Sequence, residues 1–196
     1  GKNLTASVFV DVSFLEFERQ FCISMVACLA LIDTLKQFSI PKLKIKWPND
    51  ILSENKKICG VLIENIVKQN SLQATIIGVG LNADVSAHDQ SQLDQQAVGL
   101  KQIGFEGSRN QLASDVVTEL VDVLTEFSQS GFAKLQQRWN NADCFHGQPL
   151  KVHLPSSHIE GVGMGVNSKG EYQIQTQDGL QVINAGEVSL RLNGGI

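Results

Sequence analysis

The fold of this chain is decided by the sequence Lys46-Trp47-Pro48-Asn49-Asp50 and, shortly after it, by Lys57-Ile58-Cys59-Gly60-Val61-Leu62-Ile63-Glu64. The first stretch ends a run in which apolar and polar residues alternate, as in a half-buried strand, and the proline then stops the strand. The second begins with a lysine, passes a glycine and continues as an apolar strand. Together they place a fixed cation beside bare backbone, with amide and carboxylate groups facing it. Such a site suits a carboxylate and a phosphate that are brought together.

The composition is that of a folded chain with a sizeable core. Its 196 residues allow one domain, or one domain with a small appendage, and 42% of them are apolar against 18% charged. The formal net charge of -4 argues against a nucleic-acid-binding surface as the main function. The most apolar run, from Phe21 to Leu35, is interrupted by Ser24 and Asp33 and predicts a buried helix rather than a membrane span.

The cysteines and histidines form no recognisable metal motif, and we predict no metal site built from them. We expect the cysteines to be reduced and mostly buried, in a cytoplasmic protein. The chain opens with Gly1 and shows no signal peptide, so we interpret it as a fragment, or as a protein whose upstream residues are missing from the sequence. The cysteines are Cys22, Cys28, Cys59 and Cys144, and the histidines are His88, His146, His153 and His158.

The pattern of the first 146 residues predicts an α+β arrangement, in which a mixed, largely antiparallel sheet packs against helices. Strand-like runs joined by short polar turns favour an antiparallel meander. A capping box from Ser13 to Glu16 predicts a helix that extends to about Phe38, and a second box from Ser108 to Gln111 predicts a helix that ends at Ser130-Gly131. The predicted strands are Asn3 to Val10, Leu43 to Trp47, Ile58 to Ile63 and Ala74 to Leu81.

Two other regions differ in composition. The segment from Asp84 to Gly107 is polar and predicts a long surface loop with one short helical piece. From Gly147 onward, short strands alternate with turns, and the pair Asp178-Gly179 is a hairpin signal. We predict a small SH3-like β-barrel there, and we divide the chain into residues 1–146 and 147–196.

Lys57 is the strongest candidate for a catalytic residue. It lies where a polar turn leads into an inner strand, so rigid backbone would hold its ammonium. Gly60 would let a ligand approach the backbone without meeting a Cβ atom. The structural alternative is a solvated lysine beside Lys56 and an irregularity in the strand, and the spacing Lys-x-x-Gly by itself does not exclude it.

The residues around the first turn are candidates for a nucleotide site. Asn49 and Asp50 have the side chains of ordinary turn residues, but they also suit contacts with a nucleotide and with Lys57 or magnesium. Trp47 suits stacking on a base, although a tryptophan at the end of a strand more often belongs to the core. Asn82, after the sequence Gly78-Val79-Gly80-Leu81, has either an adenine-binding role or a capping role.

In combination these motifs resemble the biotin protein ligase family, and the resemblance extends along the whole chain in order. The resemblance implies an ATP-dependent ligase with a class II synthetase-like sheet and an SH3-like C-terminal domain. Such an enzyme converts biotin and ATP into biotinyl-5′-AMP, with magnesium, and passes the acyl group to a lysine of a biotin carrier domain. The elements that carry the resemblance are Gly1-x-Asn3-Leu4-x-x-Ser7, Lys46-Trp47-Pro48-Asn49-Asp50, Lys57-x-x-Gly60-x-Leu62-x-Glu64, Gly78-x-Gly80-x-Asn82 and Gly186-Glu187-Val188-Ser189-Leu190-Arg191.

The family also implies roles for individual residues. Lys57 would be catalytic and would touch both biotin and the adenylate. The biotin-binding residues would be Lys57, Gly60, Leu62 and Gly80, and the nucleotide-binding residues would be Lys46, Trp47, Asn49, Asp50 and Asn82. The implied partner is the biotin carboxyl carrier domain of a biotin-dependent carboxylase, with a homodimer left open.

Two features depart from the family pattern. Members of the family carry a loop rich in glycine and arginine just before the strand that opens this chain, and this loop closes over biotin and the phosphates. This sequence does not contain the loop, and it contains no helix-turn-helix for DNA binding. If the protein truly begins at Gly1, we expect weak ligand binding and little ligase activity. The alternatives are therefore a lipoate ligase or octanoyl transferase and an inactive truncated scaffold. A biotin carrier domain is disfavoured because neither Met25 nor Met164 adjoins a lysine.

Overall fold

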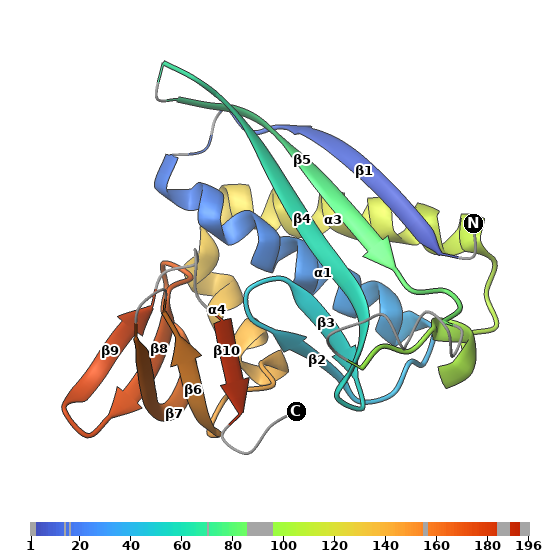
Figure 1. The fold of residues 1–196 in the computed structure, drawn as a ribbon. Coiled ribbons are helices and arrows are strands. Elements are labelled where there is room, and N and C mark those ends of the chain that lie inside the picture. Colours follow the sequence, from blue (N-terminus) through green and yellow to red (C-terminus); the bar gives the residue numbers. More distant parts are fainter. Residues whose placement is uncertain are drawn as a thin grey trace.

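A computed structural model of the chain describes residues 3–13, 15, 17–69, 71–85, 96–154, 157–183 and 189–192. The described strands form two five-stranded sheets, with two long helices packed against the first (Figure 1). In chain order the elements are β1 (Leu4–Asp11), η1 (Phe17–Cys22), α1 (Ile23–Gln37), β2 (Leu43–Lys46), β3 (Asp50–Ser53), β4 (Lys56–Lys68), β5 (Ser71–Leu81), η2 (Leu100–Ile103), α3 (Arg109–Ser130), α4 (Phe132–Ala142), β6 (Pro149–His153), β7 (His158–Val166), β8 (Tyr172–Thr176), β9 (Gly179–Ile183) and β10 (Ser189–Leu192).

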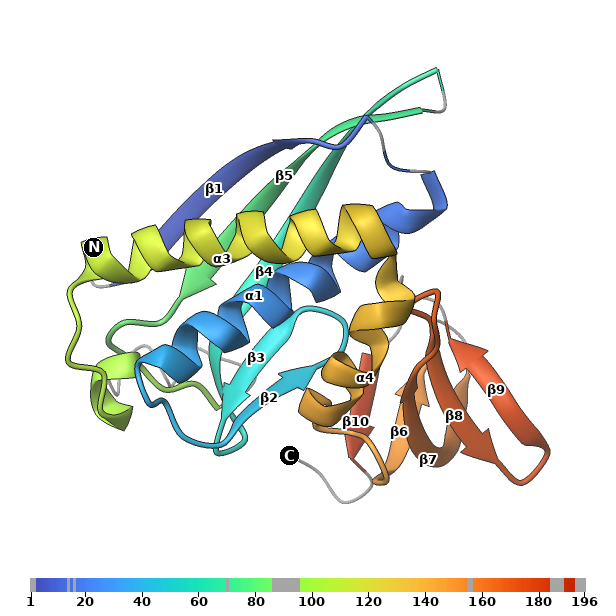
Figure 2. The same cartoon turned by 180° about the vertical axis from the view of Figure 1, so that it is seen from behind.

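The first sheet has the strand order β1-β5-β4-β3-β2, and every pair of neighbouring strands in it is antiparallel. The meander predicted from the sequence is confirmed for β2 to β5. Helices α1 and α3 lie on the same side of this sheet (Figure 2). The inner face of the sheet therefore carries a row of fully buried side chains, among them Ile45, Ile51, Cys59 and Leu81.

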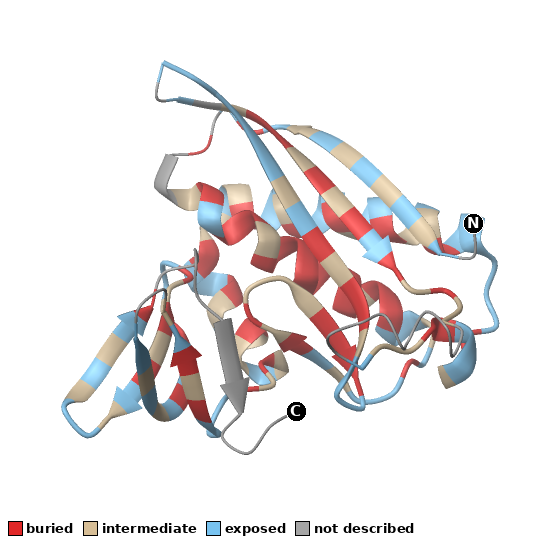
Figure 3. Cartoon of the chain, viewed as in Figure 1, coloured by how far each residue is buried: buried red, intermediate tan, exposed pale blue. Residues whose placement is uncertain are grey.

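The opposite face of the first sheet is exposed in the part of the chain that the structure describes. Its apolar side chains Phe9, Leu62 and Ile66 are 66%, 62% and 44% exposed. Along β1 the burial alternates residue by residue, as expected for a strand with one face on the core (Figure 3). We call the side that carries Phe9, Leu62 and Ile66 the open face.

The first helix starts later than the capping box predicts. A 3-10 helix from Phe17 precedes α1, which begins at Ile23. Ser13 lies in a turn, where its main-chain N–H and its hydroxyl donate to the carboxylate of Asp11, at 3.0 and 2.7 Å, so the helix does not start at the predicted box. Its predicted partner Glu16 lies outside the described residues.

The apolar composition of α1 is explained by its packing. The stretch Arg19–Gln37 is long and apolar enough to cross a membrane, but 72% of its most apolar window is buried inside the protein. It packs against β2, β3 and β4 of the first sheet and against both α3 and α4 (Figure 2). This agrees with the buried helix predicted from the sequence.

Three strands differ from their predicted bounds. Strand β3 was expected as part of a turn, and β4 and β5 extend beyond the predicted apolar cores into the polar segments up to Lys68 and from Ser71. The extensions pair with each other and project as a hairpin past the helices (Figure 1). They are held by the ladder between the two strands rather than by burial, which is why apolar patterning misses them.

The second half of the helical layer follows the sequence closely. The hydroxyl of Ser108 accepts a hydrogen bond from the main-chain N–H of Gln111 at 3.1 Å, so the cap is confirmed, although the Gln111 side chain donates to Asp115 instead of reaching back. Gly131, with φ of 70°, separates α3 from α4 in the left-handed region that favours glycine. The short helical piece predicted in the loop is η2, while residues 86–95 lie outside the described ranges.

The second sheet has the order β10-β6-β7-β8-β9, again with antiparallel neighbours. The hairpin signal at Asp178-Gly179 is confirmed, because it joins β8 to β9. The α+β class with antiparallel sheets is thus confirmed. The closure of the second sheet into an SH3-like barrel and the division at residue 146 stay predictions.

Candidate functional site

The candidate residues converge on one row that crosses the open face. Register places Lys46 opposite Asp50, Asp50 opposite Gly60, Gly60 opposite Gly80, and Gly80 opposite Thr5. Directly opposed residues of antiparallel strands project from the same side of the sheet. The row therefore brings charged side chains from β2 and β3 beside two glycines of β4 and β5.

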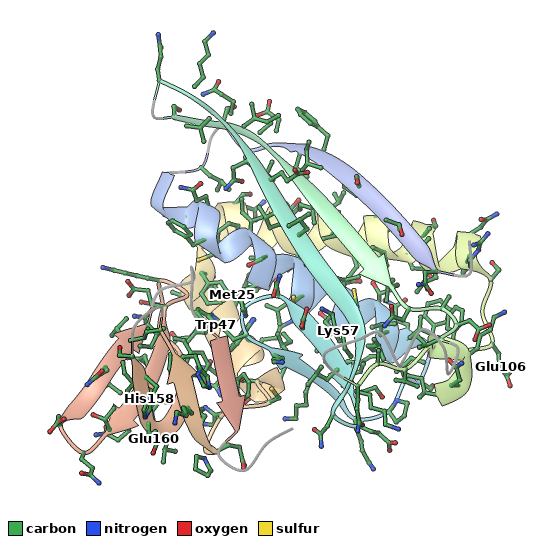
Figure 4. All side chains as sticks on the ribbon, viewed as in Figure 1. Met25, Trp47, Lys57, Glu106, His158 and Glu160 are labelled. Atoms are coloured by element: carbon green, nitrogen blue, oxygen red, sulfur yellow. The ribbon has the colours of Figure 1, made fainter. Side chains whose placement is uncertain are left out.

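At the centre of this row Lys57 forms an ion pair with Asp50. The Lys57 Nζ atom lies 2.6 Å from Asp50 Oδ1, and the two side chains are 30% and 16% exposed. Figure 4 labels Lys57 on β4. A register shift in the β3–β4 pairing, between Ile51 and Leu52, allows the Lys57 side chain to reach the same face as Asp50. The pair is thus a half-buried charge arrangement at the edge of an exposed glycine floor.

The main chain of Lys57 is held on both sides. Its N–H donates to the carbonyl oxygen of Gln96 at 2.8 Å, and its own carbonyl accepts from the N–H of Val98 at 3.0 Å and from the Asn82 side chain at 3.2 Å. This short parallel contact, through Ala97, fixes the backbone from which the ammonium projects. Residues 96–98 belong to the segment predicted as a surface loop, and their sequence carries no signal for this role because so short a pairing has no periodic pattern.

Gly60, Gly78 and Gly80 differ in how close a Cβ atom at each position would come to neighbouring atoms. A Cβ atom at Gly60 would lie 3.2 Å from both Cε and Nζ of Lys57 and 3.4 Å from Asp50 Oδ1, so the absence of a side chain lets the ammonium lie over the strand. At Gly80 the nearest atom would be the Gly60 carbonyl oxygen at 3.8 Å, and at Gly78 it would be Leu62 Cβ at 3.5 Å. Those are ordinary contacts, so the protein itself tolerates a methyl group there. The three glycines form a strip of bare backbone beside the exposed side chain of Leu62.

Asn49 and Asn82 are tied to the same strand. The Asn49 amide group donates to the Val61 carbonyl at 2.8 Å, while the Val61 N–H donates to the Asn49 carbonyl at 2.9 Å. The Asn82 amide donates to the Lys57 carbonyl, and its N–H donates to the Ile58 carbonyl at 2.8 Å. In each carboxamide the nitrogen donates to the main chain, and the oxygen is the atom of a type that can accept from a ligand or bind a cation.

Trp47 does not have the position that base stacking needs. It is only 3% exposed, and its ring packs on Tyr172 of the second sheet with the ring centroids 5.5 Å apart. The core alternative is therefore the correct one for this tryptophan in the structure, because a base has no access to a buried ring. Lys46, its neighbour, is half-buried and lies in the row of the site.

The thiols beneath the site are unsuited to nucleophilic chemistry. Burial raises the pKa of both Cys59 and Cys28, and both are fully buried. A thiol in this state is protonated at neutral pH. Within the described ranges, moreover, no group of three or more His, Cys, Asp or Glu side chains is placed to hold a metal ion by itself.

Comparisons with known proteins agree with this geometry. Residues 1–82 match the model of the Biotin/lipoate A/B protein ligase family. The bifunctional ligase/repressor BirA of Escherichia coli is 28% identical over 169 residues, which cover 86% of this chain and 53% of BirA. The biotin–[acetyl-CoA-carboxylase] ligase of Paracoccus denitrificans is 28% identical over 176 residues, which cover 85% of this chain and 71% of that ligase.

The fold is also shared with solved structures. The biotin protein ligase from Aquifex aeolicus in complex with biotin and ATP matches with a TM-score of 0.82 and 25% identity, over 98% of this chain and 79% of that one. This chain spans about half the length of the BirA protein that it matches. By sequence and by fold, the chain is therefore similar to proteins named as biotin protein ligases.

Proposed function

We propose that this chain is the catalytic part of an ATP-dependent ligase that activates biotin as biotinyl-5′-AMP and transfers it to a lysine of a biotin carrier domain. The observation that carries the proposal is the Lys57 ammonium, held by Asp50 over the glycine strip on the open face. A solved relative that holds biotin and ATP, and relatives named as biotin ligases, support the choice of substrates.

The two substrates are both anions, and their mutual repulsion is the barrier that the site must lower. The biotin carboxylate oxygen attacks the α-phosphorus of ATP, the bond from that phosphorus to the β-phosphate oxygen breaks, and pyrophosphate leaves. Lys57 would contact both the carboxylate and the phosphate and would stabilise the charge that develops between them. The carrier lysine then attacks the acyl carbon through its neutral amine, AMP leaves with the bonding pair, and the amine releases a proton.

The remaining residues would bind and orient the substrates. Gly60, Leu62 and Gly80 would form the floor and wall of the biotin site, because two of them bear no side chain and the third is exposed beside them. Asn49, Asp50 and Asn82 would face the nucleotide. Lys46 lies close enough in the row to add positive charge near the phosphates.

Magnesium fits this set of side chains. It prefers oxygen ligands and commonly uses one or two carboxylates together with substrate phosphates. The Asp50 carboxylate and the carboxamide oxygens of Asn49 and Asn82 are of that kind, and both amide groups already donate to the main chain. When bound, magnesium would offset phosphate charge.

The proposal also includes the acceptor, which is a biotin carboxyl carrier domain, a cytoplasmic location for the protein, and its assembly as a homodimer.

The test replaces Lys57 with alanine and uses its exposed neighbour as the control. With biotin and ATP as probes, pyrophosphate release should fall by roughly 10²- to 10³-fold in Lys57→Ala, the usual cost of losing one electrostatic contact to a transition state. Lys56→Ala removes the same charge from an exposed position and should keep its rate within about twofold, since exposed charges contribute little. Equal losses in both variants would contradict the assignment. Pyrophosphate release with lipoate or octanoate but not with biotin would assign the chain to the alternative acyl transferases.

A further inference from the structure

The edge of the first sheet nearest the site is covered by the segment that leads into the second sheet. Asp143, just after α4, forms a parallel bridge with Ile45 of β2, and the N–H of Cys144 donates to the Ile45 carbonyl at 2.9 Å. One residue earlier on β2, the Lys44 ammonium donates to the Asn141 carbonyl at 3.2 Å. The strand that leads into the Trp47 turn is therefore fixed by the last turn of α4 and by the residues that follow it.

Asp143 also fixes a side chain of the second sheet. Its carboxylate is 3% exposed and accepts the hydroxyl of Tyr172 at 2.8 Å and the N–H of Phe145 at 3.0 Å. Burial raises the pKa of Asp143 to about 6, while the two hydrogen bonds and the nearby charges of His146 and Lys44 act in the opposite direction. Because an unpaired polar group is costly at such a depth, the pair holds the fully buried Tyr172 in one orientation.

Tyr172 in turn contacts Trp47, which precedes the turn that carries Asn49 and Asp50. Its ring lies 5.5 Å from that of Trp47, at an interplanar angle of 52°, and Trp47 lies where the two sheets meet (Figure 4). Asn49 and Asp50 follow Trp47 directly after the proline, and they bind Val61 and Lys57. A shift of the tryptophan ring would therefore be transmitted through two residues of backbone to the partner of Lys57.

We propose that Tyr172, fixed by Asp143, is a positioning residue: it holds Trp47, and through Trp47 it sets the turn that aims Asp50 at Lys57. The second sheet then contributes to the reaction without touching a substrate. The kinetic consequence rests on the proposed ligase function, whereas the structural consequence does not. The floor residues lie on β4 and β5 of the first sheet, whereas Tyr172 lies on β8 of the second sheet and packs on Trp47, so the effect should appear in kcat rather than in the KM for biotin.

The experiment compares Tyr172→Leu, which removes the ring contact, with Tyr172→Phe, which keeps the ring and loses only the bond to Asp143. Ile174→Val is the matched control, because Ile174 is fully buried in the same strand and faces the core of the second sheet. Two readouts are taken on each purified protein. One is pyrophosphate release with biotin and ATP, and the other is exchange of the Val61 amide hydrogen by NMR, which reports on the bond from Val61 to Asn49.

We expect Tyr172→Leu to lower kcat by about 10-fold while the KM for biotin stays within about twofold, since misplacement of a catalytic group by about 1 Å costs up to about 100-fold. Exchange of the Val61 amide should become faster in the same variant. Tyr172→Phe should show a smaller change in the same direction, and it keeps the test informative if Tyr172→Leu does not fold. Ile174→Val should change neither readout.

Three results would overturn the proposal: unchanged amide exchange in both Tyr172 variants, an equal effect of Ile174→Val, or a rise in KM with kcat unaltered. A wild-type protein that releases no pyrophosphate would count against the ligase function. The amide exchange would still decide whether Tyr172 positions the turn.

Discussion

Gly60→Ala is the substitution for which the structure gives the clearest expected size of effect. The added methyl group would lie 3.2 Å from Cε and Nζ of Lys57, whereas carbon atoms in ordinary contact are about 3.5 to 4.0 Å apart. The Lys57 side chain must therefore move by roughly 0.3 to 0.8 Å, because it is the flexible partner and the strand is not. Asp50 Oδ1, at 3.4 Å from the new atom, limits the direction in which the ammonium retreats.

The displacement of the Lys57 side chain gives an expected change in kcat. If a 1 Å misplacement costs about 100-fold, a shift of this size should lower kcat for adenylate formation by roughly 4- to 40-fold. Stability should change in the opposite direction, because alanine is favoured over glycine inside a strand by roughly 0.5 to 1 kcal/mol. For a chain of this length that gain raises Tm by about 1 to 4 °C.

The assay is pyrophosphate release with biotin and ATP, run alongside thermal unfolding. Gly80→Ala is the matched control, since Gly80 lies directly opposite Gly60 and a Cβ atom there would be 3.8 Å from its nearest neighbour. It should gain similar stability and keep its kcat, while the KM for biotin rises because the methyl group occupies the floor. A lower Tm for Gly60→Ala, or equal kcat values for the two variants, would refute the steric reasoning.

Two further predictions concern buried ionisable groups. Burial raises the pKa of Asp143 from 3.8 to about 6, so the folded protein holds this proton more tightly than the unfolded chain does. Its free energy of unfolding should then decline as the pH rises from 4 to 6, by up to about 3 kcal/mol for this group. Urea titrations at several pH values should show that decline weakened in Asp143→Asn, and parallel curves for the two proteins would exclude it. Burial also raises the pKa of the Cys22 and Cys144 thiols to about 12. Iodoacetamide at pH 8 should therefore label the native protein slowly, and it should label the unfolded protein at all four cysteines. Rapid labelling of the native protein, followed by mass spectrometry, would contradict this.

Local patterns predicted the elements whose signal lies within one strand or helix. Alternation from Leu43 onward gave β2, and the polar and apolar periodicity after Ser108 gave α3, because both elements bury one face against the core. Strand β3 was not predicted, because it has only four residues, shortly after Pro48, and so short a segment shows no alternation of apolar and polar residues. It exists as a strand because β2 and β4 pair with it on either side.

Local sequence did not decide the start of the first helix or the environment of Trp47. The stretch from Ser13 matches a capping box, yet Ser13 lies in a turn and α1 begins only at Ile23. For Trp47 the sequence left stacking and core packing open. Its partner Tyr172 belongs to a strand of the other sheet, so no local pattern could favour one alternative.

The sequence by itself determined that Lys57 stands where a polar turn leads into the strand that carries Gly60, and that the fold is of the α+β class with antiparallel strands. Only the tertiary structure decided that Asp50 meets Lys57, that Gly80 lies beside Gly60, and that the second sheet supports the turn through Tyr172. The physical reason is register. Which residues oppose one another across strands depends on burying the whole inner face against α1 and α3, and a slip of one residue would turn every side chain of the site to the other face.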